Sequence, residues 1–201
     1  MKVLVIFSGG MDSTALLYSL RAEGHTLKTI TFDYGQRHRV ELDHAARIAS
    51  VANVEHEVID LSAIAGAIAG QSSQVNPDVE VPDGHYTEES MKATVVPNRN
   101  MIMLSVAVAH AISIEFEAVA YGAHAGDHTI YPDCRQEFVD AMKSVISLCD
   151  WQSIALLTPF IDKSKAQIAA IGHEVEAPFA MTWSCYKGGD KQCGTCGTCV
   201  E

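Results

Sequence analysis

The segment VLVIFSGGMDST, residues 3–14, decides the fold of this chain. The apolar run Val3–Phe7 predicts a buried strand, and the amphipathic run that begins at Ser13 predicts a helix. Glycine and hydroxyl residues fill the turn between them. Such a turn directs backbone N–H groups and the positive end of a helix dipole at one point, which suits a phosphate group. The segment therefore predicts a phosphate-binding loop after the first strand.

Asp12 is the unusual residue of this turn, because a carboxylate beside a phosphate repels it unless a cation lies between them. Mg²⁺ held by one carboxylate and by phosphate oxygens resolves that conflict. The chain contains no GxxxxGK[ST] segment, so the turn is not a Walker A loop. A serine- and glycine-rich turn that only caps a helix is the alternative interpretation.

The rest of the chain alternates between two hydrophobic patterns. Strand-like runs occur at residues 3–7, 27–32, 55–59, 118–121 and 154–157. Helical patterns occur at residues 13–21, 40–51, 100–114, 136–148 and 163–171. This alternation predicts an α/β fold of the Rossmann-like type with a parallel, doubly wound sheet, in which ligands bind beyond the carboxyl ends of the strands.

Two further segments carry weaker structural predictions. Residues 71–95 lack periodicity and contain two prolines, which predicts a long loop that serves either as a lid over the site or as a subunit contact. Residues 63–70, rich in alanine, glycine and isoleucine, predict a packed helix. Cys149 is expected to be a buried helix residue.

Composition limits the class of protein. With 201 residues, of which 48% are hydrophobic, the chain suffices for one domain with a substantial core. A net charge of −11, from 25 acidic and 14 basic side chains, argues against a nucleic-acid partner and favours a small-molecule substrate. No export signal is visible, and the longest apolar stretch, residues 101–109, is too short for a membrane span. We therefore expect a cytoplasmic protein without a membrane partner.

The C-terminal cysteines have metal-ligand spacing, C-x7-C-x2-C-x2-C. Four thiolates in this pattern fit a closed tetrahedral Zn²⁺ site, which is structural because no ligand position remains open. A [4Fe–4S] cluster and redox-active thiols are the alternatives. We expect residues 1–180 to form a nucleotide-binding domain and residues 181–201 a zinc-binding segment, with the ligands Cys185, Cys193, Cys196 and Cys199.

Four more segments are unusually polar: FDYGQRH (32–38), VPNRN (96–100), YPDCR (131–135) and TWSCY (182–186). Turns and caps alone explain several of their residues, with Asn98 or Asn100 as the expected N-cap of the following helix. Together with SGGMDST and CGTCGTC, and in this order, they resemble the QueC family. The segment SGGMDST also resembles the PP-loop of the N-type ATP pyrophosphatases, whose signature is SGGxDS.

The resemblance covers essentially the whole chain and implies a function. It implies an adenine nucleotide α-hydrolase fold, structural zinc, and commonly a homodimer. It also implies a ligase that converts 7-carboxy-7-deazaguanine, ammonia and ATP into the nitrile preQ0, a precursor of queuosine. PP-loop enzymes usually cleave ATP between the α and β phosphates.

Site residues follow from the resemblance and from their placement. The predicted catalytic residues are Asp12, Arg99 and Lys165, although Lys165 also fits an ordinary lysine at a helix start. Nucleotide and Mg²⁺ are predicted to contact Phe7, Ser8, Gly9, Gly10, Met11, Asp12, Ser13, Thr14, Phe32, Asp33 and Tyr34. The pocket for the deazaguanine and its carboxylate is predicted to contain Gln36, Arg99, Asp127, Tyr131, Asp133 and Arg135. An arginine suits the carboxylate and an aspartate suits the guanine-like N–H edge, but the sequence does not decide which residue does which.

Two departures from the family pattern keep alternatives open. Thr129-Ile130 replaces the usual Ser-Gly pair, and an isoleucine there is expected to narrow the pocket or alter the backbone. The family normally continues with a basic tail after the last cysteine. A PP-loop tRNA-modifying sulfurtransferase and a QueC-like protein that acts on a macromolecular partner are the competing hypotheses. His38, His124 and His128 are weaker site candidates.

Overall fold

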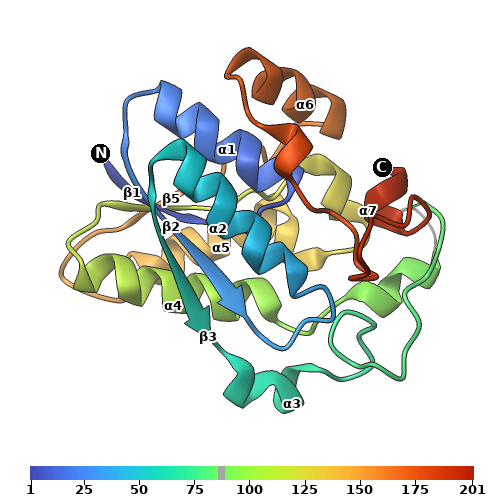
Figure 1. Cartoon of the computed structure of the whole chain (residues 1–201). Helices are drawn as coiled ribbons and strands as arrows, with labels where there is room; N and C mark the ends of the chain where they lie inside the picture. Colours follow the sequence, from blue (N-terminus) through green and yellow to red (C-terminus); the bar gives the residue numbers. More distant parts are fainter. Residues whose placement is uncertain (86–88) are drawn as a thin grey trace.

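The computed structural model describes residues 1–85 and 89–201 and contains one parallel sheet in the order β3-β2-β1-β4-β5 (Figure 1). The strands are β1 (Lys2–Ile6), β2 (Thr26–Asp33), β3 (Glu55–Asp60), β4 (Ala118–Ala120) and β5 (Ala155–Leu157). The α-helices are α1 (Met11–Ala22), α2 (Val40–Ala52), α3 (Ala65–Ile68), α4 (Arg99–Ser113), α5 (Gln136–Ile146), α6 (Lys165–Glu174) and α7 (Gly197–Val200). The 3₁₀ helices are η1 (Ser62–Ile64), η2 (Glu89–Thr94), η3 (Ala125–Thr129), η4 (Pro132–Cys134) and η5 (Phe179–Met181).

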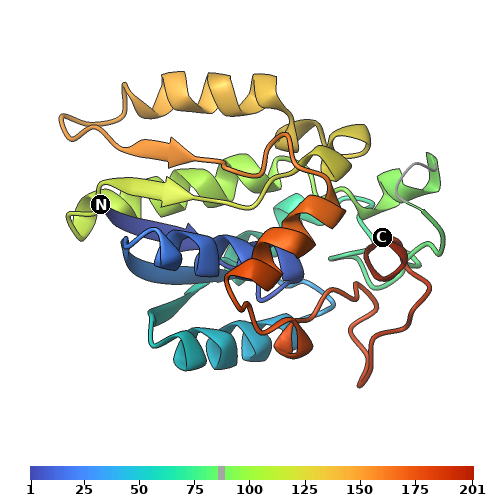
Figure 2. The ribbon, with the colours of Figure 1, turned by 90° about the horizontal axis from the view of Figure 1, so that it is seen from above.

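Helices cover both faces of the sheet, with α1, α2 and α6 on one side and α4 and α5 on the other (Figures 1 and 2). The central strand β1 shows why. Val3 and Val5 pack into a cluster with residues of α1, α2 and α6, whereas Leu4 packs into the cluster that contains α4 and α5. Successive side chains of a strand point to opposite faces, so an unbroken apolar run is buried on both.

The predicted fold class is confirmed. Each predicted strand and each of the five predicted helical segments is present, with ends shifted by a few residues. The start of α6 shifts from residue 163 to Lys165 because Ser164 caps it. The Ser164 Oγ accepts the Gln167 N–H, and the Gln167 side-chain oxygen accepts the Ser164 N–H, which is a capping box.

Two local predictions are wrong, and a third, the N-cap at Asn98, is confirmed in position but not in its side-chain bond. Residues 63–70 form a short 3₁₀ turn and the four-residue helix α3 on the surface, with only Ile68 buried, because the segment has too little apolar surface facing the core. Cys149 lies beyond the end of α5 and is exposed. Asn98 occupies the N-cap position of α4 in a left-handed conformation without a side-chain capping bond. Within the predicted loop 71–95, residues 89–94 form η2, and residues 86–88 lie outside the described residues.

The stretch Glu89–Ser113, which includes α4, is by length and composition apolar enough to cross a membrane, with a mean hydropathy of 1.2. Leu104, Ala107 and Ala111 of this stretch are fully buried in the cluster beneath the sheet. One face of α4 is therefore buried against the sheet, while 28% of the apolar window as a whole is buried, and length and composition alone are weak evidence for a membrane span.

The topology places the site. Chain connections run outward from β1 in one direction to β2 and β3 and in the other direction to β4 and β5, so the sheet reverses its winding between β1 and β4. Ligands of doubly wound sheets bind beyond the carboxyl ends of the strands at this point. The C-terminal segment and α7 lie at the same end of the sheet (Figure 2).

Candidate active site

A cavity opens at the carboxyl ends of β1 and β4. Its walls come from the turn after β1, from the ends of β2 and β4, from the start of α4 and α6, and from the C-terminal segment. The lining residues that were expected at the site are Phe7, Ser8, Asp12, Ser13, Phe32, Tyr34, Arg99, Asp127, Tyr131 and Lys165, together with the weaker candidates His38 and His124.

The turn after β1 is held close to α2. Gly9 has a φ of +74°, and a Cβ on it would lie 2.6 Å from the backbone nitrogen of Ala45. Only glycine fits such a position. The Ser13 Oγ donates to the Gly10 carbonyl at 3.1 Å and lies 3.1 Å from the Ser8 Oγ. Among the described residues no side chain caps the N-terminus of α1 at Gly10, so this helix end suits an anion.

Asp12 and Lys165 meet across the cavity from α1 and α6. The Lys165 Nζ lies 2.8 Å from the Asp12 Oδ2 and 3.5 Å from a carboxylate oxygen of Glu201. Burial raises the pKa of Asp12, but a hydrogen bond with His124 and the charge of Lys165 outweigh it, so this pKa lies below its usual value. Burial lowers the pKa of Lys165, and the negative charges of Asp12 and Glu201 more than compensate, so its pKa is raised. Both side chains are therefore charged.

His124 links this pair to Asp127. Its Nε2 lies 3.6 Å from the Asp12 Oδ2 and 3.5 Å from the Asp127 Oδ2, and its Nδ1 accepts the Gly126 N–H at 3.1 Å. Because Nδ1 is an acceptor, the proton sits on Nε2 and faces the two carboxylates. Burial is the main reason why the pKa of Asp127 is raised. We call Asp12, Lys165, His124 and Asp127 the paired-charge cluster.

The paired-charge cluster offers an oxygen ligand that suits a hard cation such as Mg²⁺. The second carboxylate oxygen of Asp12, Oδ1, is buried and has no hydrogen-bond partner among the residues that the structure describes. Carboxylate oxygens are the ligands that Mg²⁺ prefers. Asp12 therefore fits a magnesium ligand.

A second group of side chains surrounds Arg99, at the first turn of α4. Its Nη1 donates to the Gln74 Oε1 at 3.1 Å and lies 3.5 Å from the Tyr34 hydroxyl. Neither neighbour carries a charge, and burial raises the pKa of Tyr34 to about 12. The Tyr131 hydroxyl lies 2.6 Å from the Thr94 Oγ1 and 3.5 Å from the Tyr186 hydroxyl. We call Tyr34, Gln74 and Arg99 the Arg99 cluster.

Other expected site residues have their side chains elsewhere. The Gln36 amide donates to the Phe32 carbonyl and to Glu41. Asp33 pairs with Arg39. The Asp133 carboxylate accepts the Asn100 N–H at 3.2 Å and so caps α4, the role expected of Asn98 or Asn100. Arg135 is exposed and donates to the His128 carbonyl. Gly9, Gly10, Met11 and Thr14 belong to the turn and to α1 but not to the cavity wall.

The departure at Thr129-Ile130 leaves the cavity open. Ile130 is buried in the cluster that contains α4 and α5 and does not line the cavity. The expectation that it narrows the pocket is wrong, because its side chain points into the core. The backbone here forms η3, which carries Asp127 to the cavity.

Sequence reasoning missed several lining residues, notably Glu41, Gln74, Tyr186 and Glu201. The Glu41 carboxylate accepts from Gln36 and lies 3.4 Å from the His38 Nε2. Glu41 lies three residues after His38 of FDYGQRH, and this closeness to a distinctive motif could have identified it as a site residue from the sequence. Gln74 is fully buried and comes from the aperiodic segment 71–95, which offered no signal. That segment therefore contributes a residue to the wall of the cavity.

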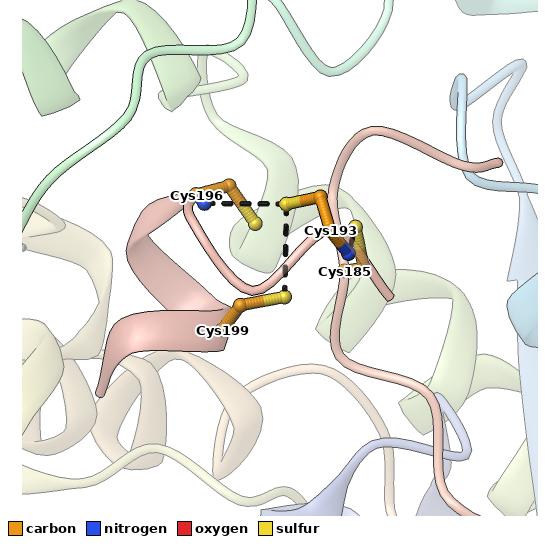
Figure 3. Close-up of side chains that lie close together, drawn as sticks. All are labelled: Cys185, Cys193, Cys196 and Cys199. Atoms are coloured by element: carbon orange, nitrogen blue, oxygen red, sulfur yellow. Dashed lines mark hydrogen bonds between the residues drawn. The ribbon is translucent and has the colours of Figure 1, made fainter. Parts of the chain in front are cut away.

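The four C-terminal cysteines converge (Figure 3). Their sulfur atoms all lie within 4.8 Å of one another, and the sulfurs of Cys193 and Cys199 are 3.9 Å apart. Zn–S bonds of about 2.3 Å place tetrahedral sulfur ligands roughly 3.8 Å apart. The N–H groups of Thr195 and Cys196 donate to the Cys193 sulfur at 3.4 and 3.3 Å. Burial raises the pKa of Cys193, but these donors outweigh it and lower the pKa to about 6. The donor set and its spacing fit Zn²⁺.

The cysteine segment contacts two segments that contribute to the cavity wall, the turn after β1 and the segment 71–95. The Trp183 N–H donates to the Gly9 carbonyl at 3.0 Å, and the Trp183 indole donates to the Cys185 carbonyl at 2.9 Å. On the other side, Cys196 forms a β-bridge with Asp83 of the segment 71–95. The cysteine segment therefore joins the phosphate-type turn to the loop that carries Gln74.

The chain matches a known family over nearly its whole length. The family model described as "Queuosine biosynthesis protein QueC" matches residues 2–201. A 7-cyano-7-deazaguanine synthase of Caldicellulosiruptor saccharolyticus is 50% identical over 201 residues, which cover 100% of this chain and 88% of the relative. A 7-cyano-7-deazaguanine synthase of Rhizobium etli is 53% identical over 203 residues, with 100% and 85% covered.

Among solved structures, the fold resembles that of a 4-thiouridine synthetase crystallised with RNA and bound ATP. The TM-score is 0.58 at 16% identity, and the match covers 90% of this chain and 42% of that chain. At this identity the likeness shows the fold alone.

Proposed function

Because the chain belongs to the QueC family, we propose that it is a 7-cyano-7-deazaguanine synthase, an ATP-dependent carbon–nitrogen ligase. Its substrates are 7-carboxy-7-deazaguanine, ammonia and ATP, and its product is the nitrile preQ0. The family match over residues 2–201 carries this proposal. The cavity where the sheet reverses its winding between β1 and β4 supports it. Its wall combines an anion-binding turn with the guanidinium of Arg99, which forms no ion pair with a described residue.

The chemistry requires two activations. A carboxylate resists ammonia because its oxygen is a poor leaving group. The carboxylate oxygen attacks a phosphorus of ATP, the α phosphorus if the PP-loop resemblance holds, and pyrophosphate leaves. Ammonia then attacks the carbonyl carbon, the phosphate ester leaves, and loss of a proton gives the amide. A second activation at the amide oxygen, followed by loss of the ester and of two protons from nitrogen, gives the nitrile.

We place the ATP phosphates at the turn after β1. The N-terminus of α1 and the hydroxyls of Ser8 and Ser13 bind phosphate oxygens there, and Lys165 stabilises the charge of the leaving pyrophosphate. Asp12 would hold Mg²⁺, which would neutralise part of the phosphate charge. The nucleoside part lies along Phe7, Phe32 and Tyr34 at the ends of β1 and β2.

We place the deazaguanine between the two clusters. Arg99 suits the carboxylate because a guanidinium binds it through two parallel hydrogen bonds. Asp127 suits the N–H edge of the guanine-like ring, and Tyr131 lines the same wall. Gln36, Asp133 and Arg135, whose side chains lie outside the cavity, are not included in this pocket.

The competing hypotheses receive less support. A sulfurtransferase needs catalytic cysteines, but four of the six cysteines are clustered with the spacing of structural zinc ligands. A net charge of −11 also disfavours an RNA substrate. The homodimer, the cytoplasmic location and the division at residue 180 stay predictions; light scattering of the purified protein tests the first.

The test of the proposal is direct. Purified protein is incubated with Mg-ATP, ammonia and 7-carboxy-7-deazaguanine, and the products are analysed by mass spectrometry. We expect the nitrile, with the amide as an intermediate when ATP is limiting. Absence of both products, under conditions where ATP binding is measured independently, rejects the ligase function. Elemental analysis of the same preparation is expected to give zinc, and iron with a brown chromophore would overturn the zinc assignment.

A further inference from the structure

Arg99 forms no ion pair with any residue that the structure describes. No carboxylate in the described part of the chain lies within 4.0 Å of its guanidinium, and its hydrogen bonds go to the neutral oxygens of Gln74 and Tyr34. Asp133, the acidic residue whose negative charge acts on Arg99 in space, accepts the Asn100 N–H and makes no ion pair with the guanidinium in the described part of the chain. Removing a guanidinium from water without a counter-charge is costly. The arrangement favours a ligand that brings a negative charge.

The orientation of Arg99 depends on Gln74. The Gln74 Nε2 donates to the Thr94 carbonyl at 2.8 Å, which fixes the amide so that Oε1 faces Arg99 and the Tyr34 hydroxyl. Gln74 is fully buried, and its backbone carbonyl accepts the Arg37 N–H at 2.7 Å. A neutral acceptor held in this way directs the guanidinium and leaves its charge intact.

We propose that Gln74 is a positioning residue which orients Arg99 toward the carboxylate of the substrate, so that the site distinguishes the anionic acid from the neutral amide formed from it. This inference rests on the proposed function. A glutamine is required because a glutamate at this position forms an ion pair with Arg99 and cancels the charge that binds the acid. A carboxylate brings a full negative charge and two oxygens that accept parallel hydrogen bonds from a guanidinium, whereas the neutral amide offers one acceptor oxygen, so the acid depends on Arg99 more than the amide does.

The experiment compares both substrates in three variants. Gln74→Glu adds the competing charge, Gln74→Met removes the acceptor at similar volume, and Gln71→Glu makes the same charge change at an exposed residue of the same segment. For each variant, KM and kcat are measured with 7-carboxy-7-deazaguanine and with the corresponding 7-amide, each at saturating ATP and ammonia. Melting temperatures are recorded in parallel.

In Gln74→Glu we expect KM for the acid to rise by at least tenfold more than KM for the amide. Gln74→Met is expected to give a smaller rise in KM, again larger for the acid than for the amide. Gln71→Glu is expected to match the parent protein. Equal changes for both substrates in Gln74→Met, or no change for the acid in Gln74→Glu, overturn the inference. If Gln74→Glu does not fold, the substrate ratio in Gln74→Met decides alone.

The outcome is separable from the proposed function. Failure of the parent protein to convert either substrate rejects the ligase itself. Conversion of both substrates by the parent protein, together with equal effects in the Gln74 variants, rejects only the role of Gln74.

Discussion

The two charged clusters of the cavity differ in how their buried charges are compensated. In the paired-charge cluster, Asp12 has Lys165 at 2.8 Å and His124 at 3.6 Å, so positive and negative groups compensate one another before any ligand arrives. In the Arg99 cluster, the hydrogen bonds of the guanidinium to described residues go to two neutral oxygens. The first arrangement pairs its charges within the protein and leaves only the buried Asp12 Oδ1 without a partner in the described part of the chain, whereas the second forms an ion pair only when a ligand brings the negative charge.

This difference predicts different kinetic consequences. Groups that hold phosphates and the cation act on charge that develops during phosphoryl transfer, and their loss lowers kcat. A group that binds the substrate's existing charge acts before the reaction, and its loss raises KM. Substitutions in the two clusters are therefore expected to separate in kcat and KM.

The largest effect is expected for Asp12→Ala. Without this carboxylate the cation has no ligand in the turn, and Lys165 loses its partner at 2.8 Å. We expect kcat to fall by about 10³-fold or more, equivalent to roughly 4 kcal/mol, with KM for the acid changed by less than threefold. Steady-state kinetics tests this, with thermal melting as the control for folding. Activity within tenfold of the parent protein contradicts the metal role.

The next effect is expected for Cys196→Ser, which removes a metal ligand from the segment that joins the two clusters. Zinc content and stability should decrease together, because metal binding contributes to folding energy. A loss of about 3–4 kcal/mol corresponds to a melting temperature lower by roughly 10 °C in a chain of this size. Elemental analysis and thermal melting measure both. The exposed Cys149 is the matched control: Cys149→Ser should alter neither quantity.

The fold was predictable because its signals are local. The run Val3–Phe7 reads as a strand buried on both faces, and SGGMDST marks the following turn, so the first βα unit needs no knowledge of distant residues. The same logic failed at residues 63–70, where a helical composition was expected to pack. Helix formation in proteins depends on burying a face, and this segment has little to bury it against.

The site was predictable only where motif and side-chain direction coincide. Asp12 and Lys165, both predicted from their motifs, have side chains that line the same cavity. Asp133 and Gln36 belong to equally distinctive motifs, but their polar groups bind nearby backbone atoms instead of facing the cavity. Gln74 gave no signal, because its role depends on Thr94 and Arg99, which lie 20 and 25 residues further along the chain. Contacts of this range are set by tertiary structure.

A smaller effect is expected for His124→Ala. His124 contacts Asp12 and Asp127, and the Gly126 N–H fixes its ring, so it positions the two carboxylates. We expect kcat to fall about tenfold, with partial recovery in His124→Gln, whose amide retains one donor. Comparing the Mg²⁺ concentration needed for half-maximal ATP binding in both variants gives a readout independent of turnover. Equal behaviour of the two variants contradicts a positioning role that depends on the donor.

The smallest effect separates two arginines that the sequence treats alike. Arg135 lies in YPDCR and was expected in the pocket with Arg99, but it is exposed and its Nε donates to the His128 carbonyl at 2.8 Å. Arg135→Ala should therefore change KM for the acid by less than twofold, whereas Arg99→Gln should raise it roughly tenfold to a hundredfold, because a charged hydrogen-bond partner is lost. A large rise in KM for Arg135→Ala, measured on protein of unchanged melting temperature, means that Arg135 reaches the substrate from a position that a single chain does not show. In that case Arg99 is not the only cation that binds the carboxylate of the substrate, because the guanidinium of Arg135 contributes as well. The contrast between paired and unpaired charge then no longer depends on Arg99 alone.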